Sequence, residues 1–236
     1  MLTMLLLASA SKAQSDASIE SRESHMSPHL WRGIYDASTS GYFKVDTIGL
    51  GALPLEAEYR GIIVEAVSWK DPKGEHALFL TQTGDFISTD STGYEQERAE
   101  LHVHHWLREE KSKQWRRAWR ISDHNLCANL DQYVGFMDRS LSITDLDADG
   151  EAEITVVYEL SCSGDIGPGE LKVIMYEGNK KCGIRGAAAL CHPESNHLLE
   201  PSKPSADNAA KAEPTFLAFL IDRWKKFECP PPKQFY

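Results

Sequence analysis

The feature that most constrains this fold is a recurring pair of segments in which apolar and polar residues alternate on either side of a short polar turn. A period of two is typical of a β-strand with one buried face. Four such pairs follow one another. Strand, turn and strand cover 62–69, 71–74 and 77–81 in the first pair, and 101–107, 109–113 and 115–121 in the second. They cover 140–144, 145–153 and 154–160 in the third pair, and 171–176, 177–180 and 182–186 in the fourth. Short turns join antiparallel neighbours, so we expect a mainly β fold, an antiparallel meander of hairpins that forms a curved sheet, a sandwich or a barrel.

A helical stripe follows the β region. Its large apolar residues are Phe216, Phe219, Leu220, Trp224 and Phe227. Pro214 is acceptable in the first turn of a helix, and the proline run 230–232 would end it. We therefore expect a C-terminal helix packed on the sheet. The basic residues Arg223, Lys225 and Lys226 leave a membrane-surface helix as the alternative.

The remaining segments complete the expected organisation. The apolar run 1–10 ends in Ala8-Ser9-Ala10, which is typical of a signal peptide. The run is short and has no basic residues at its start. A start codon assigned too far downstream, or a buried N-terminal segment, would explain these two departures from the pattern. The Ser-, Asp- and Glu-rich stretch that follows predicts a flexible lead-in. The expected units are a signal peptide and lead-in at 1–26, a β domain at 27–191, a loop or linker at 192–213, the helix at 214–228 and a tail at 229–236.

Charge and hydropathy exclude some classes of function. The formal net charge of −10 disfavours general binding to nucleic acid or anionic membrane, because both need clustered Lys and Arg. No later segment reaches the roughly 18 apolar residues of a spanning helix, so we expect no transmembrane segment. We expect a periplasmic or secreted location.

Cysteine use bears on the same compartment. Of the five cysteines, Cys127 and Cys162 bracket the third hairpin, and a bridge between them is the preferred pairing. Cys182 with Cys191 is the second choice, which leaves Cys229 over. Five reduced, partly buried cysteines in a cytosolic protein are the alternative.

The turn of the third hairpin is a ladder of acids. Its acidic residues are Asp145, Asp147, Asp149, Glu151 and Glu153, with Gly150 among them. Calcium takes six to eight oxygen ligands, and closely spaced carboxylates supply them. An EF-hand is excluded because its twelfth position, here Val156, would have to be an acid, and because the flanks read as strands. A solvated acidic β-turn without metal is the alternative.

This ladder resembles the Asp-x-Asp-x-Asp-Gly-x-x-Asp/Glu loops of integrin-type β-propellers. The resemblance implies a Ca²⁺ ion held by the side chains of Asp145, Asp147, Asp149 and Glu153 and by the backbone carbonyl of Glu151. The motif does not recur in this chain, so the propeller architecture does not carry over.

The sequence offers two further candidate sites. His102 and His104 alternate on one strand beside His105, but a third metal ligand at suitable spacing is not visible, so packing is the preferred interpretation. Asp131 and Asp165 lie near the preferred disulfide and are the candidate acids of a glycan hydrolase, although neither has an evident partner carboxylate.

The central part of the chain also resembles an uncharacterised family of exported bacterial proteins labelled surface-polysaccharide biosynthesis proteins. The segments that carry the resemblance are 143–155, 162–165, 172–178 and 184–186, whereas Gly164-Asp165-Ile166-Gly167-Pro168 departs from the family's Gly-Asp-Val-Ser-Pro. The label implies a role in the cell envelope, with glycan or protein partners. We expect an exported, calcium-stabilised and non-catalytic binding or envelope-assembly module; the alternatives are the glycan hydrolase and an inhibitor or partner of an envelope enzyme.

Overall fold

The structure of this protein is a computed structural model, which describes residues 33–38, 41–128, 130–164, 167–192, 195 and 197–229. The expected signal peptide and lead-in, and the tail beyond Cys229, lie outside the described residues.

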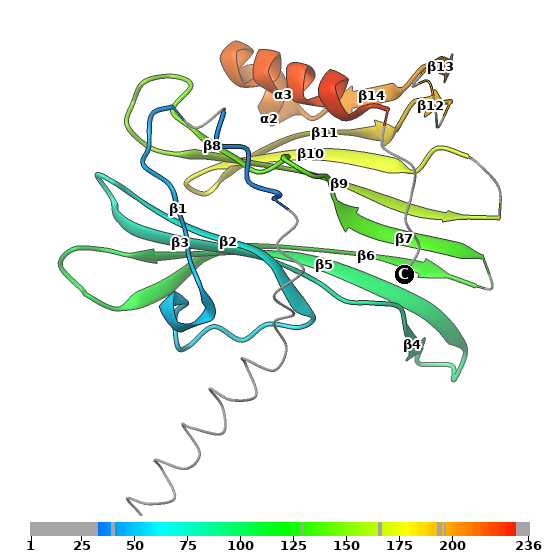
Figure 1. Cartoon of the computed structure of the whole chain (residues 1–236), viewed down its shortest axis with the longest axis horizontal. Helices are drawn as coiled ribbons and strands as arrows, with labels where there is room; N and C mark the ends of the chain where they lie inside the picture. The colour runs from blue at the N-terminus through cyan, green and yellow to red at the C-terminus, as the bar shows by residue number, and fades with distance from the viewer. Residues whose placement is uncertain are drawn as a thin grey trace, which may run out of the picture.

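The described chain is a β-sandwich of two antiparallel sheets with a helical layer on one outer face (Figure 1). The first sheet runs in the order β1-β2-β3-β5-β4, and β6 also pairs with β5. Its strands are β1 (Asp46–Thr47), β2 (Ile62–Asp71), β3 (Gly74–Gln82), β4 (Phe86–Thr89), β5 (Glu95–Arg108) and β6 (Trp115–Cys127). A short 3-10 helix, η1 (Leu50–Ala52), lies between β1 and β2.

The second sheet runs in the order β14-β11-β10-β9-β7, and β8 also pairs with β9. Its strands are β7 (Asp131–Phe136), β8 (Ser142–Thr144), β9 (Glu153–Ser163), β10 (Glu170–Glu177), β11 (Lys180–Ala187) and β14 (Lys203–Ala206). A separate two-stranded sheet joins β12 (Leu190–Cys191) to β13 (Leu198–Glu200), and two helices follow, α2 (Asn208–Ala212) and α3 (Pro214–Phe227).

The four expected hairpins are confirmed as β2/β3, β5/β6, β8/β9 and β10/β11. Of the three expected arrangements the chain forms the sandwich, because it leaves the first sheet after β6 and starts the second at β7. The preferred disulfide Cys127–Cys162 is also present, with Cα atoms 5.6 Å apart, and it joins the end of β6 to β9 in the other sheet. It therefore links the two layers covalently.

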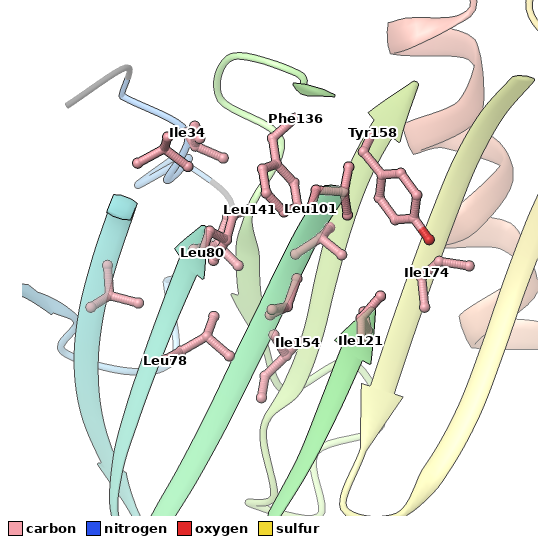
Figure 2. Close-up of a cluster of buried hydrophobic side chains, with 14 of the residues drawn as sticks. Ile34, Leu78, Leu80, Leu101, Ile121, Phe136, Leu141, Ile154, Tyr158 and Ile174 are labelled. Atoms are coloured by element: carbon pink, nitrogen blue, oxygen red, sulfur yellow. The ribbon is translucent and has the colours of Figure 1, made fainter. Parts of the chain in front are cut away.

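Apolar side chains from both sheets meet between the layers (Figure 2). The labelled members of this cluster are Ile34, Leu78, Leu80, Leu101, Ile121, Phe136, Leu141, Ile154, Tyr158 and Ile174. The core follows from the alternation in the sequence, since every second residue of each strand points to the same face.

The helix α3 packs on the outer face of the second sheet. Phe216, Leu220, Trp224 and Phe227 are buried there against Val157 of β9 and other residues of that face. The expected core-docking helix is thus confirmed. Arg223, which favoured a membrane-surface helix, is 1% exposed and is an internal ion-pair partner.

The rest of the cysteine pairing differs from expectation. Cys191 pairs with Cys229, with Cα atoms 5.6 Å apart, whereas Cys182 is free and buried. Cys182 belongs to the apolar cluster under α3, and the helix returns the chain to β12, where Cys229 meets Cys191. The pairing of Cys182 with Cys191, and an unpaired Cys229, were therefore wrong.

The segment 192–213, expected as a loop or linker, carries β13, β14 and α2 within its described residues. Pro204 disfavoured a strand, but β14 is an edge strand, where a missing N–H is tolerated. Asp207 then caps α2 by accepting a hydrogen bond from the backbone N–H of Ala210, at 2.9 Å.

A buried ion cluster fastens α3 to the N-terminal described segment. Asp36 is 0% exposed and accepts hydrogen bonds from Lys226 Nζ at 2.8 Å and Arg223 Nη1 at 3.4 Å. Arg223 Nη2 also donates to the carbonyls of Arg139 and Ser140, at 3.1 and 3.0 Å, in the turn before β8. Burial opposes ionisation of Asp36, but the hydrogen bonds from Lys226 and Ser38 outweigh it and hold its pKa well below the usual range.

We expect Asp36→Asn to lower the free energy of unfolding by about 3–5 kcal/mol, because it leaves the buried Arg223 guanidinium without its counter-ion. Urea unfolding measures this loss. Asp46→Asn is the matched control, since the Lys44–Asp46 pair is exposed, and it should change stability by less than about 1 kcal/mol. Equal losses in the two variants would contradict the role of Asp36.

Candidate metal centre

The acidic loop lies between β8 and β9, whose register pairs Thr144 with Glu153. Ala148 and Gly150 have positive φ angles of 61° and 85°, so the loop turns back on itself. Backbone N–H groups donate to the loop carboxylates: Gly150 to Asp145 at 3.3 Å and Glu151 to Asp149 at 2.7 Å. These contacts orient the carboxylates within the loop.

As a result, carboxylate oxygens of Asp145, Asp147 and Asp149 lie within 4.8 Å of one another. Asp147 and Asp149 are exposed, and Asp145 is half-buried. Three acids this close repel one another unless a cation or protons compensate for their charge. The loop alone thus brings together three of the expected ligands.

Glu153 belongs to a second acidic group, with Asp147 and Glu177, which shares only Asp147 with the first. It is 0% exposed, and its Oε2 accepts hydrogen bonds from the backbone N–H of Leu146 at 2.8 Å and from Thr144 Oγ1 at 3.0 Å. The other oxygen, Oε1, is buried and has no hydrogen-bond partner. A carboxylate oxygen of Glu153 lies within 4.8 Å of those offered by Asp147 and Glu177. A buried carboxylate oxygen without a donor is costly, and a bound cation would remove that cost.

The pKa values of the buried acids also indicate that the site lacks positive charge. Burial raises the pKa of Glu153 to about 7, and the charge of Asp147 adds to this rise. Burial also raises the pKa of Glu177, and the charges of Asp147, Asp149 and Glu151 contribute. Without a cation, the site therefore favours protonation of its inner carboxylates.

The side chain of Glu151 forms an ion pair instead of joining the other loop carboxylates. Its carboxylate pairs with Lys73 in the β2–β3 turn and belongs to neither acidic group. A Cβ on Gly178, whose φ is 51°, would lie 2.7 Å from Glu151 Oε1, so the β10–β11 turn also packs closely on this side chain. The β2–β3 turn of the first sheet and the β10–β11 turn of the second therefore both meet the acidic loop.

Glu177 is the site residue that the sequence analysis missed. It lies at the end of β10, directly opposite Glu153 in the β9–β10 register. Two like charges in opposite positions destabilise a sheet unless something compensates for them. Pairing the strands of the third and fourth hairpins would have revealed that Glu153 and Glu177 are opposite each other. That pairing requires the register between the two hairpins.

The donor set limits the metals that fit. Both groups consist of carboxylates only, without His nitrogen or Cys sulfur. Oxygen ligands suit hard cations such as Ca²⁺, Mg²⁺ or Mn²⁺, whereas zinc and copper prefer nitrogen and sulfur. The geometry therefore supports an acidic cluster that could hold a hard metal ion.

The three histidines do not form a metal site in the described part of the chain, where the groups of three suitable ligands are the two acidic ones. His102 and His104 lie on the outer face of the first sheet, with ring centroids 5.9 Å apart. His105 lies on the inner face, where its Nε2 is 2.8 Å from Nδ1 of His76. Cross-strand packing, the preferred interpretation, accounts for all three.

Of the two candidate hydrolase acids, the structure describes Asp131. Asp131 is exposed at the start of β7 and belongs to neither acidic group. Asp165 lies outside the described residues.

Two further observations bear on classification. Within the described ranges, no helix is long and apolar enough to cross a membrane. No protein family, curated protein or solved structure matches this chain.

The raised pKa of Glu153 predicts a pH dependence of stability in chelator. The folded protein holds this proton up to about pH 7, whereas the unfolded chain releases it near the ordinary pKa of 4.5. The stabilising contribution is therefore complete below pH 4.5 and is lost as pH rises through 7, a fall of about 3 kcal/mol in the free energy of unfolding. Urea titrations across this range, with EDTA present, measure it.

Glu153→Gln should flatten most of that slope, because the amide does not titrate. Asp90→Asn is the control, since Asp90 is exposed and belongs to neither acidic group. A slope that survives unchanged in Glu153→Gln would assign the dependence to other groups.

Proposed function

We propose that this protein is an exported, calcium-stabilised β-sandwich that acts as a non-catalytic binding or envelope-assembly module. The observation that carries the proposal is the buried carboxylate of Glu153, which has one oxygen without a hydrogen-bond partner and which lies beside Asp147 and Glu177. This arrangement favours binding of a cation over binding of a substrate, because the carboxylates of the loop point toward one another.

Calcium fits the loop better than magnesium does. Calcium accepts six to eight oxygens in flexible geometry, including backbone carbonyls, whereas magnesium requires a near-octahedral set and keeps several waters. The side chains of Asp145, Asp147, Asp149 and Glu153, with the carbonyl of Glu151, would supply the set implied by the integrin-type loops. Glu177 adds a further carboxylate from β10.

The ion would act structurally. Bound between the β8–β9 loop and Glu177, it would fasten two hairpins of the second sheet at one end. The pairing of Glu151 with Lys73 would extend this link to the β2–β3 turn of the first sheet. Calcium would thus replace repulsion between acids with a cross-link between turns.

Export is supported by the two disulfides. Disulfides persist in oxidising compartments and are rare in the cytosol of most organisms. A periplasmic or secreted location agrees with the signal-peptide pattern at 1–10. The link to surface polysaccharide rests on the family resemblance alone.

Calcium binding is the first test. Isothermal calorimetry should detect calcium binding to the wild type, and calcium at one hundred times Kd should add about 2.7 kcal/mol to the free energy of unfolding. Glu153→Gln and Asp147→Asn should lose both effects. Asp90→Asn should keep them, although Asp90 orders its own turn through Thr92 and Tyr94 in the same manner as the loop aspartates. Identical melting curves in calcium and in EDTA, with no heat of binding, would refute the proposal.

The absence of catalysis has a separate test. Purified envelope polysaccharide incubated with the protein should co-elute with it and keep its chain length. Shortened glycan would instead establish the hydrolase alternative, and a lack of association would favour the third possibility, an inhibitor or partner of an envelope enzyme.

A further inference from the structure

A groove of about 400 Å³ opens on the outer face of the first sheet. This volume falls in the range of about 300–1,000 Å³ that small-molecule sites occupy. His102 and His104 of β5 line it, together with Arg120 and Ser122 of the neighbouring strand β6. The segment before β2 contributes residues 58–60. The sheet and the preceding segment therefore build the groove jointly.

Aromatic rings support one side of the groove. The ring of His104 stacks on Phe79, with centroids 4.5 Å apart and planes 9° apart. Tyr59 meets the same Phe79 edge-on, with centroids 5.6 Å apart. These contacts hold the imidazole in a fixed orientation.

His104 is buried without polar partners. It is 1% exposed, and neither ring nitrogen has a hydrogen-bond partner. Burial, helped by the charges of His102, Arg120 and Arg117, lowers its pKa to about 3, so the ring is neutral at physiological pH. A neutral imidazole has one donor and one acceptor, and leaving both unused is costly.

The other buried polar groups of the groove are partnered. His102 Nδ1 lies 2.8 Å from Ser122 Oγ, and its Nε2 lies 3.3 Å from Glu100 Oε2. Glu100 also pairs with Arg98 at 2.6 Å and Arg60 at 3.7 Å. The unused hydrogen-bonding capacity of this cluster therefore belongs to His104.

Arg120 supplies the charge. It lies directly opposite His104 in the β5–β6 register, and its side chain is exposed. Among the ion pairs of the described residues, none includes Arg120. A guanidinium binds a carboxylate through two parallel hydrogen bonds. The lining also holds the carboxylates of Glu58 and Glu100, so Arg120 marks one position in the groove for an anionic group.

We propose that this groove binds a hydroxylated carboxylate, of which a uronic acid unit is the representative. Its carboxylate would pair with Arg120, and a ring hydroxyl would accept a hydrogen bond from the N–H of the His104 imidazole. The exposed carboxylate of Glu58 would accept from a second hydroxyl, and the exposed Arg120 side chain would turn aside to admit the ligand to His104. This inference deepens the proposed binding role, on which it rests, but it uses none of the cation ligands.

Sodium glucuronate is the probe, and methyl glucoside is the neutral comparator. Calorimetry should show saturable binding of glucuronate, and methyl glucoside should bind at least about tenfold more weakly because it lacks the carboxylate. Nitrogen-15 NMR of the histidine rings should show glucuronate shifting the His104 signals more than those of His105, which lies on the inner face. An oligouronate run in parallel distinguishes a polymer site, which binds the oligomer more tightly, from a site for the free acid.

Three variants test whether the groove residues contact the ligand or only support the fold. Arg120→Gln should weaken glucuronate binding by about tenfold or more. His104→Phe keeps the stacked ring, should raise the melting temperature by removing unpaired nitrogens, and should also abolish binding. Arg116→Gln makes the same charge change on the same strand, at an exposed residue that pairs with Glu109 outside the groove lining, so it should change affinity by less than about threefold.

The outcomes that overturn the proposal are distinct from those that bear on calcium. No saturable binding of either uronate form, equal binding of methyl glucoside, or unchanged binding in both groove variants would refute the groove assignment. Glu153→Gln, measured as folded protein, should lose calcium binding and retain glucuronate binding. A groove failure alone would leave the cation site standing, and a calcium failure alone would leave the groove standing.

Discussion

Burial of both faces of β9 is the constraint on which the rest of the structure depends. Its residues 153–161 are all buried, whereas an ordinary sandwich strand exposes every second side chain. Ile154, Val156 and Tyr158 enter the core between the sheets, and Val157 faces the cluster under α3. Thr155 and Glu159 lie on the same face as Val157, so the layer that covers this face takes polar side chains out of water together with an apolar one.

The same double burial creates the acidic site. Glu153 opens β9 on the same face as Val157, and its carboxylate is buried with the rest of the strand. The β10 register then places Glu177 opposite it, and the loop folds Asp147 over both. Burial at the first position of β9 thus gives the Glu153 carboxylate a raised pKa and places it beside Asp147 and Glu177.

The sequence predicted the features that depend on neighbouring residues. Period-two alternation identified the four hairpins, and the spacing of Asp145, Asp147 and Asp149 identified the loop, because both patterns lie within one contiguous segment. Contacts that depend on how hairpins and layers align were not predictable in this way. Glu177 needed the β9–β10 register, and the Cys191–Cys229 bridge needed the path of α3. The proline-containing segment 192–213 concealed an edge strand, since proline excludes central strands only.

Two buried acids of this protein show how their surroundings decide their roles. Asp36 and Glu153 are both 0% exposed, but Asp36 lies beside Lys226 and Arg223, and its pKa is lowered. Glu153 has hydroxyl and backbone donors on one oxygen only, further acids lie beside its carboxylate, and its pKa is raised. The first arrangement is complete within the chain and fastens α3. The second lacks a cationic side chain of its own among these contacts, which makes the acidic loop a candidate cation site rather than an internal ion pair.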